Sequence, residues 1–233
     1  MAAGSVAVVF AEGGVAPSAF EGATNTVAVL LLLTEFAMLR AALSRSQVRL
    51  YAVQSLLVSA LAGIVAAGRD IPELYALAVV SLLFKVVAVP WVVTRLLRDA
   101  QVEIAGSGAL GVATATLVAL ALAGFGFFAV GSLDVRSRFL PHAALGLSVA
   151  IVLVAFVLMI VRRDVVSQAV GFFSLENGVS LASLVVAAGM PLIIEVAFLF
   201  DLLVAVVVFG VLMRVHHHRT ATLSTESLTA LRG

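Results

Sequence analysis

Runs of about 20 apolar residues recur along this 233-residue chain, and they constrain its fold more than any other feature. A helix of that length crosses roughly 30 Å of hydrocarbon. Inside lipid, every backbone N–H and C=O group must find its hydrogen-bond partner within the protein. The sequence does not show the alternation of polar and apolar residues typical of a membrane β-barrel. We therefore expect an all-α, polytopic membrane protein.

Composition supports this fold class and excludes several functions. Charged residues make up 12% of the chain, about half the share found in typical soluble domains. No basic domain is present, which argues against a nucleic-acid partner. The chain has no cysteine, which excludes disulfides, thiolate ligation of iron–sulfur clusters and thiol nucleophiles.

The apolar runs predict seven transmembrane helices joined by short polar connections. The first 24 residues lack the basic start of a signal peptide, so we expect the first helix to remain as an anchor. Residues 1–22 then form a short external segment, 23–214 the membrane domain and 215–233 a cytoplasmic tail. The predicted helices cover about residues 23–43, 49–68, 72–97, 108–131, 141–161, 165–188 and 191–214.

Arginine placement predicts the orientation of the chain. With the N-terminus outside and the C-terminus in the cytoplasm, the outer segments contain only Arg69, Arg136 and Arg138. The other ten arginines then lie on the cytoplasmic side, where basic residues are enriched. The alternation of the basic loops also fits an odd number of spans.

Ionisable residues deep inside apolar runs are the most informative side chains. Glu35, Lys85 and Glu176 lie near the middle of their predicted helices, and Asp201 lies about ten residues into the last. Glu195 lies nearer the outer end of that helix. Each charge at mid-membrane depth costs at least about 2.5 kcal/mol. Burial favours the neutral form of a carboxyl group, so some of these groups should exchange protons readily. A proton relay is one interpretation, and charged contacts that only fix helix packing are the other.

Polar neighbours accompany these charges. Gln168, Glu176, Ser180 and Ser183 fall on one face of their predicted helix, which should face other helices or water. Ser81 lies one turn before Lys85. Pro90 then removes a backbone hydrogen bond, which predicts a kink.

The sequence shows no site for covalent or metal catalysis. It contains no H-E-x-x-H motif and no Walker loop. The run from His216 to Arg219 is better explained by favourable charge at a helix C-terminus than by metal binding. We expect no metal site and no cofactor in this chain.

Five segments resemble the hydrogenase-4 component E family. Their order and spacing cover nearly the whole chain from about residue 25. They are Arg49–Leu57 (RLYAVQSLL), Leu83–Trp91 (LFKVVAVPW), Leu175–Gly178 (LENG), Gly189–Glu195 (GMPLIIE) and Asp201–Ala205 (DLLVA).

The last three predicted helices, which include residues 165–214, are also similar to the K subunit of complex I. A basic pair at Arg162-Arg163, the acidic positions Glu176 and Asp201, and a basic end follow that subunit's order. When the basic pair and Gly171 are aligned, Phe173 takes the glutamate position of that subunit and Glu176 falls about one turn later.

The resemblance implies a non-catalytic subunit of a membrane-bound hydrogenase or formate hydrogenlyase-like complex in the bacterial plasma membrane. Its partners would be other membrane subunits, including antiporter-like ones, and lipid. Nickel–iron and iron–sulfur centres would belong to the partner subunits. Two alternatives remain open, namely a structural anchor for assembly and a subunit of a cation/proton antiporter.

Overall fold

The computed structural model describes residues 19–100, 110–131, 142–186, 197, 201 and 203–212. These residues form helices and no β-strand, so the predicted all-α fold class is confirmed. The helices are α2 (Ala19–Arg40), α3 (Ser44–Arg69), α4 (Pro72–Ser81), a π-helical segment η1 (Leu82–Ala88), α5 (Val89–Ala100), α6 (Val112–Gly131), α7 (His142–Val161), α8 (Val165–Val186) and a last helix at Leu203–Leu212.

Six helices in the described ranges are long and apolar enough to cross a membrane. One of them is the continuous span Pro72–Leu97, which runs through α4, η1 and α5. The seventh span, predicted at residues 191–214, lies partly outside the described residues, which show ten of its residues as an apolar helix. The number of seven spans, the orientation and the domain boundaries stay predictions.

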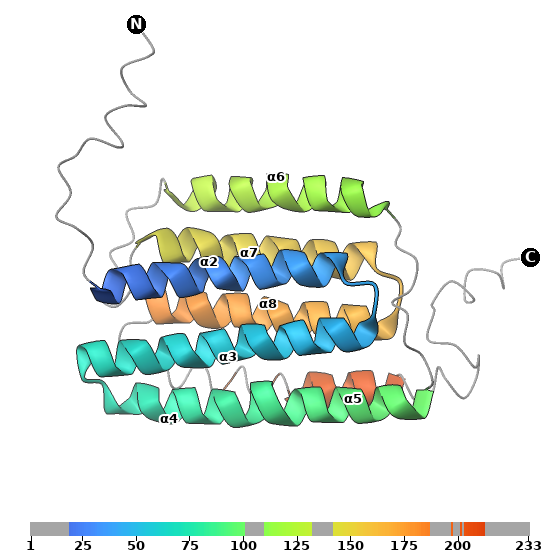
Figure 1. Cartoon of the computed structure of the whole chain (residues 1–233), viewed down its shortest axis with the longest axis horizontal. Helices are drawn as coiled ribbons and strands as arrows, with labels where there is room; N and C mark the ends of the chain where they lie inside the picture. Colours follow the sequence, from blue (N-terminus) through green and yellow to red (C-terminus); the bar gives the residue numbers. More distant parts are fainter. Residues whose placement is uncertain are drawn as a thin grey trace, which may run out of the picture.

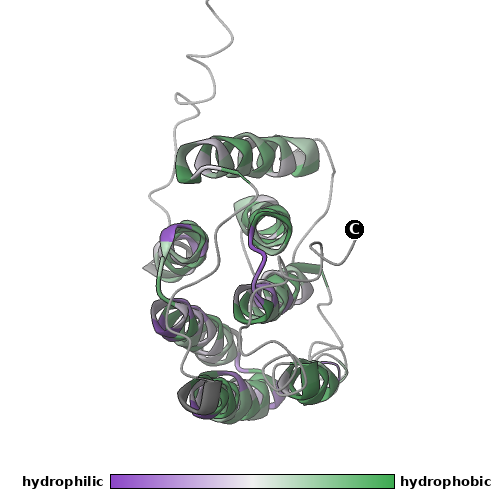
Figure 2. Cartoon of the chain, turned by 90° about the vertical axis from the view of Figure 1, so that its right-hand side faces the viewer, coloured by the Kyte–Doolittle hydropathy of each residue, from purple (hydrophilic) through white to green (hydrophobic). Residues whose placement is uncertain are grey.

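The helices run along one common axis and form a layered bundle (Figure 1). α7 and α8 are the most closely packed pair, α2 lies beside α7, and α3 lies beside α8. α6 covers the outside of α7, and the α4–η1–α5 span packs on α3. Most residues of the helices are apolar (Figure 2), and many large apolar side chains are exposed on the bundle, as expected of a surface that faces lipid.

The two hairpins α2–α3 and α7–α8 are joined at their connecting loops. The Nη2 atom of Arg162 donates to the carbonyl oxygens of Leu39 at 2.9 Å and Ala41 at 3.0 Å. Ser167 Oγ donates to Gln47 Oε1 at 2.7 Å. Because the last carbonyl groups of a helix have no partner within it, Arg162 completes the end of α2.

The irregularity of the third span lies one turn before the proline. Pro90 predicted a kink, and the structure shows a π-helix at Leu82–Ala88. At its end, the Val89 N–H donates a hydrogen bond to the carbonyl oxygen of Phe84. Buried side chains of this span recur every four residues, at Leu77, Ser81, Lys85, Val89, Val93 and Leu97. In a continuous α-helix a four-residue step overshoots a full turn by about 40°. A π-helical turn contains more residues and offsets that drift, which keeps Lys85 facing the bundle.

Gly178 sets the distance between α7 and α8. A Cβ atom there would lie 2.9 Å from Val152 Cγ2 and 3.2 Å from the Val152 backbone nitrogen. Small residues allow membrane helices to approach closely, and a stiff β-branched neighbour gives little room. We expect Gly178→Ala to lower the free energy of unfolding by about 1–3 kcal/mol, measured by thermal unfolding in detergent.

Gly63→Ala is the matched control for this substitution. A Cβ atom at Gly63 in α3 would meet nothing within 4 Å. The change should be neutral or stabilising by up to about 1 kcal/mol, because alanine favours the helix. Equal losses of stability in the two variants would show that the α7–α8 approach does not depend on Gly178.

Candidate functional site

Lys85 is the central charge of the candidate site. It is the only lysine of the chain, and its side chain is fully buried although it lies in the middle of a membrane span. Lys85 Nζ donates a hydrogen bond of 2.8 Å to Ser180 Oγ, which joins η1 to α8 across 95 residues of sequence. Ser81, one turn earlier, is also buried. The structure therefore brings together three residues that the sequence placed on two separate helices.

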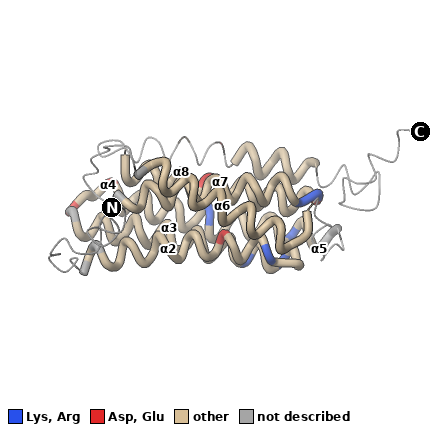
Figure 3. Tube along the Cα trace, turned by 90° about the horizontal axis from the view of Figure 1, so that it is seen from above, with Lys and Arg blue, Asp and Glu red and all other residues tan. Residues whose placement is uncertain are grey.

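Glu176 lies on α8, four residues before Ser180, and is buried. Residues four apart share one face of a helix, so Glu176 lies on the side of α8 that carries the contact with Lys85. Charged positions occur at mid-length of the bundle as well as at its ends (Figure 3). The mid-span placement predicted for Glu176 and Lys85 thus corresponds to positions inside the protein.

A small cavity lies beside the contact between Lys85 and Ser180. Its volume is about 10 Å³, and its polar lining comes from Ser81 and Ser180. This volume is at the lower limit for one water molecule, which also needs polar partners. The hydroxyl groups of Ser81 and Ser180 supply such partners close to the contact with Lys85.

Glu35 occupies a second polar cluster at the junction of α2, α3 and α8. It is fully buried, and its Oε2 atom accepts hydrogen bonds from Gln54 Nε2 at 2.8 Å and from the Ser174 hydroxyl. Asn177 Nδ2 donates to Gln54 Oε1 at 3.0 Å and to Ser55 Oγ at 2.9 Å. These side chains form one hydrogen-bonded cluster around Glu35.

Sequence reasoning missed most of the cluster around Glu35. It gave weight to ionisable residues and did not select Gln54, Ser174 or Asn177 as site residues. A polar amide within an apolar run was the available signal, because an amide buried in a membrane helix must find hydrogen-bond partners on other helices. Gln54 and Asn177 do so by bonding to each other.

The remaining predicted residues lie apart from these clusters. Gln168 is half-buried and donates to the Arg162 carbonyl at 3.3 Å, while Ser183 donates to the carbonyl of Ser180 in its own helix. Pro90 is half-buried in α5. Asp201 is exposed on the surface of the single chain. Glu195 lies outside the described residues.

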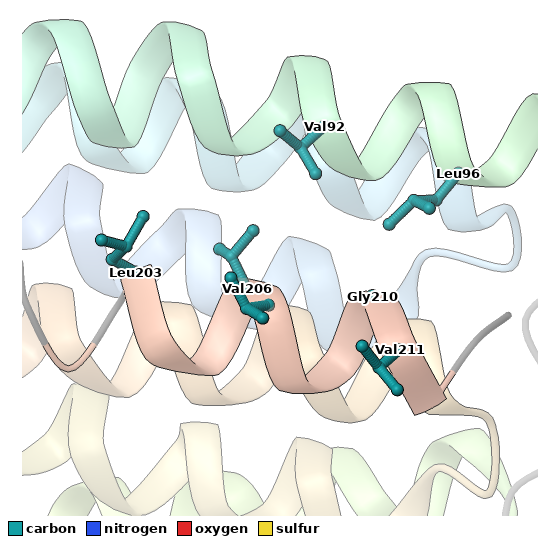
Figure 4. Close-up of a pocket in the computed structure, with 7 residues that line it drawn as sticks. Val92, Leu96, Leu203, Val206, Gly210 and Val211 are labelled. Carbon is teal, nitrogen blue, oxygen red and sulfur yellow. The ribbon is translucent and has the colours of Figure 1, made fainter. Parts of the chain in front are cut away.

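A larger hollow lies between α5 and the Leu203–Leu212 helix (Figure 4). It has a volume of about 410 Å³, and the described residues that line it are Val92, Leu96, Leu203, Val206, Val207, Gly210 and Val211. Such a lining offers no group for proton transfer or ligand orientation. Chemistry in the described part of the chain is therefore concentrated at Lys85, Glu176 and the Glu35 cluster.

The two clusters combine titratable groups with neutral hydrogen-bonding groups. No group of three or more His, Cys, Asp or Glu side chains that could hold a metal ion lies together in the described ranges. Carboxyl and ammonium groups can bind and release protons, whereas the hydroxyl and amide groups beside them donate and accept hydrogen bonds.

The chain is similar to curated proteins over different lengths. It is 24% identical to hydrogenase-4 component E of Escherichia coli over 209 residues, which cover 90% of this chain and 97% of that protein. The predicted resemblance to hydrogenase-4 component E is confirmed. The same identity and coverage hold for hydrogenase-4 component E of Shigella flexneri.

The third similarity covers only part of each chain. An uncharacterised protein of Mycobacterium tuberculosis is 46% identical to this chain over 63 residues, which cover 27% of this chain and 29% of that protein. No family model and no solved structure matches the chain. The relation to hydrogenase-4 component E therefore rests on similarity along nearly the whole sequence.

Proposed function

We propose that this protein is a non-catalytic membrane subunit of a hydrogenase-type, complex I-like assembly, and that its buried charges contribute to proton translocation or energy coupling. The observation that carries the proposal is the burial of Glu35, Lys85 and Glu176 at mid-span, with Glu35 and Lys85 hydrogen-bonded to polar side chains of other helices. The resemblance to hydrogenase-4 component E along 90% of the chain supports the assignment to such a complex.

The proposal includes a membrane orientation and a set of partners. Residues 1–22 would lie outside, 23–214 would form the membrane domain of a bacterial plasma membrane, and 215–233 would be cytoplasmic. Other membrane subunits, antiporter-like ones among them, would surround the bundle. Nickel–iron and iron–sulfur centres would be held by partner subunits, because this chain contributes no cysteine thiolate.

The buried charges provide a physical basis for coupling. A charge at mid-membrane depth costs several kcal/mol unless a counter-charge, hydrogen bonds or water stabilises it. A small shift of a partner helix, or entry of one water molecule beside Ser180, would change that stabilisation and hence the proton affinity of Glu176. Energy released by electron transfer in partner subunits could reach the proton path in this way, with Asp201 and Glu195 continuing the path from the last helix.

A purely structural role is the second candidate, and one observation favours it. The Glu35 cluster joins α2, α3 and α8 through five side chains, so its hydrogen bonds would hold the bundle together even if no proton moved. Under that role, removal of a buried polar group should impair assembly of the complex and leave the ratio of protons to electrons unchanged.

The substitution Glu176→Gln separates the two roles. Glutamine keeps the size and polarity of the side chain but cannot release a proton. We expect the assembled complex to transfer electrons while the protons moved per electron fall at least about tenfold, because the group that would carry the proton is gone. Proton uptake and electron transfer would be measured together in sealed membrane vesicles.

The matched control is Glu73→Gln, the same chemical change at an exposed carboxyl group in the first turn of α4. It should leave the ratio of protons to electrons at the native value. If Glu176→Gln assembles normally and also keeps the native ratio, Glu176 has no part in proton transfer.

A further inference from the structure

If Glu35 is ionised, the cluster around it has one oxygen–oxygen contact for which no hydrogen is available. Ser174 Oγ contacts two acceptor oxygens, Glu35 Oε2 and, at 2.9 Å, Gln54 Oε1. A serine hydroxyl has a single hydrogen and can donate to only one of them. If Glu35 were ionised, the second contact would place two oxygen atoms side by side with no hydrogen between them.

The amide of Gln54 cannot supply the missing hydrogen. Its Nε2 atom is directed at Glu35 Oε2 at 2.8 Å and at the Leu31 carbonyl at 3.4 Å, and its Oε1 atom accepts from Asn177 Nδ2 at 3.0 Å. Exchanging the two ends of this amide would bring its oxygen against the Leu31 carbonyl oxygen. The hydrogen-bond pattern therefore fixes the orientation of Gln54.

A proton on Glu35 resolves the conflict. The carboxylic acid then donates to Ser174 Oγ, and the Ser174 hydroxyl donates to Gln54 Oε1, so each short contact holds one hydrogen. The other carboxyl oxygen, Oε1, is buried and has no hydrogen-bond partner within the described residues. A neutral acid tolerates such an oxygen far better than an anion does, because an anion needs donors on both oxygens.

We infer that Glu35 binds an exchangeable proton and is a neutral acid in this structure, donating to Ser174. When the proton leaves, the Ser174 hydroxyl turns from Gln54 to Glu35, and Gln54 Nε2 still donates to the carboxylate. The Ser174 and Gln54 oxygens then share no hydrogen and must move apart. Loss of the proton therefore rotates one hydroxyl group and breaks one hydrogen bond. Its part in proton translocation rests on the proposed function, whereas its protonation does not.

Infrared spectroscopy of the full chain, reconstituted in lipid vesicles at neutral pH, tests this inference. A neutral carboxylic acid has a C=O stretch that an ionised carboxylate lacks. We expect the native protein to show such a band, shifted on transfer to heavy water, and Glu35→Gln to lose it. Glu73→Gln should keep the band. A native spectrum that loses no such band on Glu35→Gln would overturn the inference, whatever the complex does in proton translocation.

Discussion

Replacing Lys85 with methionine is expected to reduce proton translocation to background while the complex still assembles. Methionine resembles the lysine side chain in length and is apolar, so it can fill the buried volume between η1 and α8. It cannot carry a charge or donate to Ser180 Oγ. Without the ammonium group, the contact between η1 and α8 has no positive charge left to balance a carboxylate within the span. The expected loss exceeds the tenfold loss predicted for Glu176→Gln.

The measurement is the ratio of protons moved to electrons transferred in sealed vesicles, with the amount of assembled complex determined on the same membranes. Arg49→Met is the control, because it removes an exposed cation from α3 and should leave the ratio unchanged. A normal ratio in Lys85→Met would show that the buried ammonium has no role in coupling. Failure of assembly in Lys85→Met, together with normal assembly in Arg49→Met, would support the structural role instead.

Replacing Arg162 with alanine should cause the largest loss of stability. The Arg162 side chain is buried and donates to two carbonyl groups at the end of α2. Hydrogen bonds from a charged group contribute about 1.5–3 kcal/mol each, and carbonyl groups left without a donor add to the loss. We expect the free energy of unfolding to fall by at least about 3 kcal/mol, measured by thermal or chemical unfolding in detergent.

Arg163→Ala is the natural control for Arg162→Ala. The two residues are neighbours in the α7–α8 loop and carry the same charge, but Arg163 is exposed. Substitution of an exposed residue usually changes stability by less than about 0.5 kcal/mol. Equal destabilisation by the two substitutions would contradict the role of Arg162 as the group that completes α2.

Helix positions could be predicted from the sequence because lipid imposes a minimum length on every span. The predicted start of the third span at residue 72 agrees with α4, where Pro72 occupies the first turn. The start of the second span was predicted at 49, but α3 begins at Ser44. The error came from Arg45 and Gln47, which were assigned to a loop. Gln47 instead bonds to the end of α2 and to Ser167 within the protein.

The partners of the buried charges could not be predicted from the sequence. The mid-span positions of Glu35, Lys85 and Glu176 follow from counting residues along apolar runs. Their neighbours depend on which helices pack together, and nearly uniform apolar runs give no period from which to read the buried face. The π-helical turn at Leu82–Ala88 could not be predicted for the same reason. It is explained by the recurrence of buried side chains every four residues, and the structure was needed to show which side chains are buried.

Purification of the tagged full chain from its native membranes in a mild detergent tests the central claim most directly. The account predicts that hydrogenase-type subunits purify with the chain in fixed proportion, that the preparation contains nickel and iron, and that antiporter-like membrane subunits are among its proteins. The chain could instead be recovered alone or as a homo-oligomer from membranes that have full hydrogenase activity. That result would contradict its assignment as a subunit of such a complex.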